Sequence, residues 1–408
     1  MGIGPLAEIA RDAGYKVVGS DTEESLMTTE LIDKGMNIKI GPQDGTFLRD
    51  CHQTEPIDWL VYTAALKPEH AELMAAKELG IKTAKRDEFL AHIISDKKLK
   101  LIAVSGTHGK TTVTGMLIWV LQQMNIPISY SIGTTLSFGP SGQFKSDSEY
   151  FIYECDEFDR NFLHFSPHIA LIPSLDYDHP DTYENEADYL EAFRQFAIQS
   201  EQLLTWSDQH PEIFDGLFQV SQINPSEINR NFKLNGLHNL RNATLVQIAL
   251  QRLGINQDTE GILSNFPGTD RRFEKLAENL YSDYGHHPVE IAATLQLARE
   301  LSDKIVLVYQ PHQNIRQHHI KDDYTDQFEL AEEIYWLPTY LSREDSALLV
   351  LSPEELIQNL TNKDRVHIAD FNEELWQNIQ HALANGKLVV CMGAGAIDQW
   401  VRDKLKNS

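Results

Sequence analysis

Short hydrophobic runs alternate with longer amphipathic stretches along most of the chain. The runs are rich in β-forming residues, and most of them end at Gly, Ser, Asp or Pro; the clearest are 16–21, 58–65, 100–106, 168–176, 304–310 and 387–395. Buried parallel strands joined by helical crossovers give this pattern. It therefore predicts an α/β fold.

Two breaks divide the pattern. The charged stretch 85–100 ends one series of strands and helices before a new strand opens at Leu101, and a Pro-Gly turn within 266–274 precedes a fresh series near Leu280. We therefore expect three domains, 1–97, 98–270 and 271–408, each of an ordinary domain size.

Composition narrows the classes of function. The 408 residues include 35 Lys and Arg against 60 Asp and Glu, a net charge of −25. This balance gives no basic surface for nucleic acid and would repel anionic lipid. Three widely separated cysteines, the absence of a membrane-length apolar run and the lack of a signal peptide predict a soluble cytoplasmic protein without membrane insertion.

The strongest local motif is a glycine-rich loop between a predicted strand and a predicted helix that runs to about Met124. Such a loop binds phosphate through backbone amides, the helix N-terminus, a lysine and a hydroxyl that holds Mg²⁺. Val104 occupies the place of the first glycine of the general P-loop, so the loop is a shorter G-x-x-G-K-T-T. We expect it to bind phosphate through Gly106, Thr107, His108, Gly109, Lys110, Thr111 and Thr112.

At this loop the chain resembles the Mur ligase family, the ATP-dependent amide-forming enzymes of peptidoglycan precursor synthesis, and the resemblance continues in order through nearly the whole chain. It implies a Rossmann-like N-terminal domain that binds a UDP-sugar, a central P-loop ATPase domain with a parallel sheet, and a Rossmann-like C-terminal domain that binds an amino acid.

Acidic residues follow two of the predicted strands, in the segments 153–165 and 175–183. Carboxylates and a histidine at adjacent strand ends can converge on a hard cation, although solvated acidic loops would look the same. The resemblance implies that Glu154 and His179, together with Thr111, bind Mg²⁺. It gives no role to the other carboxylates of the first segment, Asp156, Glu157 and Asp159.

Two further segments are candidates for nucleotide contacts. Asn239 and Asn242 are one helical turn apart and could pair with adenine, or could equally be an N-cap and a surface amide. The resemblance to a G-x-H-N-x-x-N motif supports His238, Asn239 and Asn242. Adjacent arginines at the second boundary could be solvated or could clamp a γ-phosphate. There the family's G-x-x-R-R-F motif implies Arg272 as the clamp.

The C-terminal motifs concern the amino acid. The segment 281–291 should open a helix at Pro288, and its similarity to D-D-Y-G-H-H-P places Asp283 near the ATP ribose and His286 toward the amino acid. The segment 308–319 resembles Q-P-H-R-x-T-R-T and supports His312 and Arg316 as substrate residues. Gln313 replaces the first arginine, and Gln317 replaces the second threonine.

The resemblance implies an ATP- and Mg²⁺-dependent ligase that joins L-alanine to the carboxylate of UDP-N-acetylmuramate through an acyl phosphate, with Lys110, His179, Arg272 and His286 as catalytic residues. Two alternatives stay open. One is the recycling ligase that attaches L-alanyl-γ-D-glutamyl-diaminopimelate to the same sugar nucleotide, and the other is a catalytically silent sugar-nucleotide-binding protein.

The N-terminus departs from a dinucleotide-type fold, which opens with a strand followed by a glycine loop. Here the chain begins at the glycine-rich segment Gly2-Ile3-Gly4 itself. We therefore expect a strand upstream of residue 1.

Overall fold

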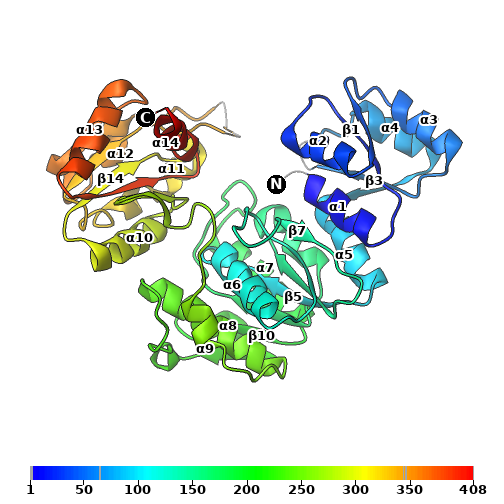
Figure 1. Cartoon of the computed structure of the whole chain (residues 1–408), viewed down its shortest axis with the longest axis horizontal. Coiled ribbons are helices and arrows are strands. Elements are labelled where there is room, and N and C mark those ends of the chain that lie inside the picture. The colour runs from blue at the N-terminus through cyan, green and yellow to red at the C-terminus, as the bar shows by residue number, and fades with distance from the viewer. Residues whose placement is uncertain (1–2, 64–65, 343, 345–346, 408) are drawn as a thin grey trace.

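The computed structural model describes residues 3–63, 66–342, 344 and 347–407, which form three units with sheets of their own (Figure 1). The strands of the three units lie within 18–85, 100–223 and 274–392. The predicted α/β class is confirmed. The domain borders at 97/98 and 270/271 stay predictions.

The N-terminal unit holds two separate pairs of parallel strands, β1 with β2 and β3 with β4. Every residue of β3 is half-buried, and Val18 at the start of β1 is 42% exposed. The expected upstream strand stays a prediction, and Met1 and Gly2 lie outside the described residues. The elements are α1 Gly4–Asp12, β1 Val18–Asp21, α2 Leu26–Asp33, β2 Asn37–Ile40, α3 Thr46–Thr54, β3 Trp59–Tyr62, α4 Ala71–Leu79, β4 Lys82–Lys85 and α5 Arg86–Asp96.

The central unit is built on a seven-stranded sheet of order β11-β10-β9-β5-β8-β6-β7, parallel except for β7. Its inner strands are hydrophobic on both faces, because α6 and α8 cover one face and α5 and α7 the other. The elements are β5 Lys100–Val104, α6 Lys110–Gln123, β6 Ile128–Ser131, β7 Gly142–Gln143, β8 Tyr150–Glu154, β9 Ile169–Ile172, α7 Glu186–Gln199, β10 Leu203–Trp206, β11 Val220–Ile223, α8 Leu237–Arg252 and α9 Glu260–Ser264, with 3-10 turns at Phe158–His164, Pro211–Phe214 and Pro225–Glu227.

The C-terminal unit has a six-stranded sheet of order β12-β13-β17-β14-β15-β16, in which β12 alone is antiparallel to its neighbour. The helix predicted at Pro288 begins there. The elements are β12 Glu274–Ala277, β13 Leu280–Asp283, α10 Pro288–Leu301, β14 Ile305–Tyr309, α11 Asn314–Ile320, β15 Glu333–Trp336, α12 Pro353–Ile357, β16 Val366–Ile368, α13 Glu373–Ala384, β17 Leu388–Met392 and α14 Ile397–Lys406, with 3-10 turns at Lys321–Tyr324 and Lys363–Arg365.

Among the helices of the described residues, none combines the length and the apolar character needed to span a membrane.

Candidate active site

The phosphate loop follows β5, the middle strand of the central sheet, and leads into α6. Gly106 and Gly109 have φ values of 123° and 84°, which residues other than glycine rarely adopt. A Cβ on Gly106 would also lie 2.5 Å from the carbonyl oxygen of Ser174. The loop therefore needs glycine at both positions, and its amides meet the N-terminus of α6 at Lys110, where an anion is favoured.

The segment after β9 holds this loop in place. The Thr107 hydroxyl donates to the Asp176 carbonyl over 2.6 Å and accepts from the Asp176 amide over 2.8 Å. The His108 amide donates to the Ser174 hydroxyl over 2.8 Å. Thr112 lies half-buried in the first turn of α6. Since both segments end strands of one sheet, the sheet itself positions the loop.

Lys110 is held by a buried carboxylate. Its Nζ lies 2.8 Å from Glu157 Oε1 and donates to the Gly106 carbonyl over 2.5 Å. The Glu157 side chain is 1% exposed. Burial raises the pKa of Glu157, but Lys110 and then His179 lower it below its ordinary value overall. The pair therefore holds a fixed ammonium beside the phosphate loop.

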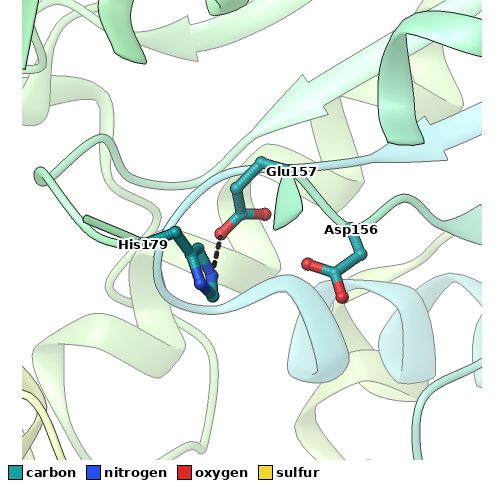
Figure 2. A group of neighbouring side chains, drawn as sticks. All are labelled: Asp156, Glu157 and His179. Atoms are coloured by element: carbon teal, nitrogen blue, oxygen red, sulfur yellow. Dashed lines mark ion pairs between the residues drawn. The ribbon is translucent and has the colours of Figure 1, made fainter. Parts of the chain in front are cut away.

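Two groups of side chains that could bind a metal ion through oxygen or nitrogen lie beside Lys110. In the first, the Thr111 hydroxyl donates to Glu154 Oε1 over 2.8 Å. In the second, ligand atoms of Asp156, Glu157 and His179 all lie within 4.8 Å of one another, and Figure 2 shows the His179 ring directed at Glu157. Within the described chain, buried Glu157 Oε2 has no hydrogen-bond partner. The second group, with its unsatisfied carboxylate oxygen, fits a hard divalent cation such as Mg²⁺. The predicted set of Thr111, Glu154 and His179 stays a prediction.

The two amides of the predicted adenine motif are placed differently. Asn242 is buried, and its Oδ1 lies 3.1 Å from the point where a Cβ of Gly109 would stand, so it contacts the phosphate loop. The Asn239 amide instead donates to the Asn235 carbonyl over 2.9 Å. Burial, followed by the charge of Arg272, lowers the pKa of His238 to about 4, so this ring is neutral.

The two boundary arginines do not lie in a helix, since Arg271 has a left-handed φ of 58°. Arg272 Nη2 reaches to 3.5 Å from the Thr111 hydroxyl. Arg271 turns away and donates to the Gly393 carbonyl over 3.0 Å. Arg272 is therefore the boundary arginine that reaches the start of α6, and its role as a phosphate clamp stays a prediction.

Asp283 is buried, and both of its oxygens accept backbone hydrogen bonds. The Phe273 amide donates to Oδ2 and the Gly285 amide to Oδ1, each over 2.7 Å. Burial raises the pKa of this carboxyl above its ordinary value. These contacts fix the backbone just before β12 and just after β13, and the expected ribose contact of Asp283 stays a prediction.

His108 joins the phosphate loop to the C-terminal unit. Its Nε2 lies 3.3 Å from Asp176, and its Nδ1 lies 3.2 Å from Glu290 at the start of α10. Burial lowers the pKa of His108, but Glu290 and Asp176 outweigh burial and raise it to about 9. Glu290 Oε1 is also 3.7 Å from Arg272 Nη1. The charged imidazole of His108 thus links the central unit to the C-terminal unit.

The predicted amino-acid residues come together at the C-terminal ends of β13 and β14. The rings of His286 and His312 are 5.5 Å apart, and Arg316 Nη1 donates to His312 Nδ1 over 3.2 Å. Burial, followed by the charge of Arg316, lowers the pKa of His286 to about 3. Gln313 has a φ of 60°, and its side-chain amide donates to the Ser342 carbonyl over 3.3 Å.

Glu157, Asp178 and Glu290 are among the carboxylates of this site that have no role assigned from the sequence. Each lies in a segment that the sequence analysis singled out, but each pairs with a cation that is distant along the chain. Spacing within one segment gives no indication of such partners. The sequence did indicate that carboxylates without a role and cationic residues both occur in motifs expected to lie close together.

Comparison with known proteins identifies the family. The Mur ligase family catalytic domain matches residues 1–98, the Mur ligase middle domain 104–210, and the Mur ligase glutamate ligase domain 271–395. The chain is 31% identical to the UDP-N-acetylmuramate–L-alanine ligase of Agathobacter rectalis, over 98% of this chain and 95% of that protein.

Two solved structures share the fold. The UDP-N-acetylmuramate–alanine ligase of Thermotoga maritima has a TM-score of 0.74 at 23% identity, covering 100% of this chain and 96% of that chain. A murein peptide ligase from Psychrobacter arcticus has a TM-score of 0.59 at 22% identity, covering 99% and 96%. The family predicted from the sequence motifs is confirmed: the chain belongs to the Mur ligase family of ATP-dependent amide-bond ligases.

Proposed function

We propose that this Mur ligase joins L-alanine to the carboxylate of UDP-N-acetylmuramate, using ATP and Mg²⁺. The relative from Agathobacter rectalis, which is named UDP-N-acetylmuramate–L-alanine ligase, supports this pair of substrates. The observation that carries a phosphoryl-transfer step is the position of Arg272, whose Nη2 lies 3.5 Å from the Thr111 hydroxyl of the phosphate loop. Cations from two units thereby meet at one phosphate-binding site.

The first step transfers the γ-phosphoryl group of ATP to the sugar carboxylate and releases ADP. Negative charge on the transferred group is offset by Lys110 at the start of α6 and by Arg272 at the boundary between the central and C-terminal units. Thr111, Glu154 and His179 would hold Mg²⁺, which supplies further neutralisation of the phosphate oxygens. Asn242 would contact the nucleotide from α8, beside Gly109.

In the second step the amine of the amino acid attacks the acyl carbon and the C–N bond forms. The C–O bond to phosphate breaks, and the departing phosphate takes up the proton that the amine loses. His286 is neutral at pH 7, because its pKa is lowered to about 3, so its ring can accept a hydrogen bond from the amine without repelling it. Arg316 and His312 would bind the α-carboxylate.

A phosphate-release assay with ATP, Mg²⁺ and UDP-N-acetylmuramate tests this proposal against a panel of amino acids and the L-alanyl-γ-D-glutamyl-diaminopimelate tripeptide. We expect release to depend on both the sugar nucleotide and L-alanine. Release with the tripeptide in place of L-alanine would instead indicate the recycling ligase. This outcome is included because Gln313 stands where the Q-P-H-R-x-T-R-T motif has an arginine. Binding of the sugar nucleotide without any release would indicate a silent relative.

A further inference from the structure

Arg316 and Asp178 form a buried ion pair that joins the C-terminal unit to the central unit. Arg316 Nε donates to Asp178 Oδ1 over 3.0 Å, and Nη2 donates to Oδ2 over 3.2 Å. The two side chains are only 6% and 10% exposed. Because two parallel hydrogen bonds fix the plane of a guanidinium, this contact sets the orientation of Arg316 as well as its position.

The remaining edge of Arg316 faces the predicted amino-acid site. Its Nη1 donates to His312 Nδ1 over 3.2 Å, and His312 lies beside His286. Asp178 is itself fixed within the central unit, since its Oδ1 also accepts the amide of His179 over 2.7 Å. A carboxylate anchored in one unit therefore orients an arginine that belongs to the other.

We propose that Asp178 is a positioning residue for the amino-acid substrate: it holds one edge of Arg316 so that the other edge binds the α-carboxylate. This inference rests on the proposed function, which supplies the carboxylate. Gln313 offers no second cation, and its amide is bonded to the Ser342 carbonyl. Displacement of Asp178 by the substrate would leave a buried carboxylate without its partner, which is strongly unfavourable.

The kinetic test compares Asp178→Asn with Asp181→Asn in the full-length protein. Asp181 is an exposed carboxylate of the same loop, so it provides a control for a general change in charge. For Asp178→Asn we expect the KM for L-alanine to rise by about 10-fold, while the KM values for ATP and UDP-N-acetylmuramate change by less than about twofold. An unchanged KM for L-alanine, or an equal rise for all three substrates, would overturn the proposal.

Hydrogen exchange in the absence of substrates gives a second test. We expect the amides of α11, which carries Arg316, to exchange faster in Asp178→Asn than in the wild type or in Asp181→Asn. Unchanged α11 exchange would also overturn the proposal. Wild-type protein that releases no phosphate with L-alanine would refute the proposed function instead, and α11 exchange would still decide whether Asp178 holds Arg316.

Discussion

Lys110 on the phosphate side takes its polar contacts from its own unit, whereas Arg316 on the amino-acid side takes its paired hydrogen bonds from another unit. Lys110 is bound by Gly106 and Glu157, all within the central unit. Arg316 lies in the C-terminal unit and is bound by Asp178 of the central unit. Lys110 can therefore be positioned within the central unit alone, but Arg316 is oriented only when the two units are in contact.

The largest expected effect is on the phosphate side. Lys110→Ala should lower phosphate release by about 10²–10³-fold, because a cation that stabilises the transferred group is lost. Lys233→Ala removes an exposed lysine and should leave release unchanged. Melting temperatures for both variants would show whether the fold persists. Near-normal release by folded Lys110→Ala would contradict the assignment of the phosphate loop.

Magnesium dependence tests the donors that lie beside the same loop. Glu154→Gln should raise the magnesium concentration for half-maximal activity by about 10-fold, since a charged ligand becomes a weak neutral one. His179→Ala should act in the same direction. Titration of activity with MgCl₂ measures both effects. If neither curve moves, these residues do not hold the cation.

The amino-acid side should respond differently. Arg316→Lys keeps the charge but loses the planar fork that meets Asp178 and the substrate together. We expect the KM for L-alanine to rise by about 10-fold, with the KM for ATP unchanged. Steady-state kinetics with each substrate varied in turn would measure the split. A parallel rise in the KM for ATP would show that the two sides are not separable.

The same contrast explains what the sequence could predict. The phosphate loop runs from the end of β5 at Val104 into α6 at Lys110, so phosphate binding could be predicted from contiguous residues. Strands with a clear hydrophobic run, such as β5, β14 and β17, and the start of α10 were also predicted, because hydrophobic runs and Pro288 act locally. The roles of Glu157, Asp178 and Glu290 depend on tertiary partners that local patterns do not encode. The pairing of N-terminal strands into two separate sheets likewise depends on tertiary contacts.

The smallest expected effect concerns His108, which connects the two sides. The groups that face its ring are Asp176, Glu290 and His287, and His287 is neutral because burial, followed by the charge of His108, lowers its pKa to about 4. The pKa of His108 itself is raised to about 9, against about 6.5 in an unfolded chain. Its ion pairs therefore stabilise the fold fully below pH 6.5, and this contribution is lost as the pH rises through 9.

We accordingly expect the melting temperature of the wild type to fall between pH 6 and pH 9.5 by about 2–4 °C more than that of His108→Gln, which cannot become charged. The difference between the two proteins removes the titration of all other groups that they share. Scanning calorimetry at both pH values measures it. An equal decline in the two proteins would mean that His108 carries no charge between Asp176 and Glu290. The contact between the central and C-terminal units beside the phosphate loop would then depend on packing, on Arg272 with Thr111 and on the pair of Asp178 with Arg316.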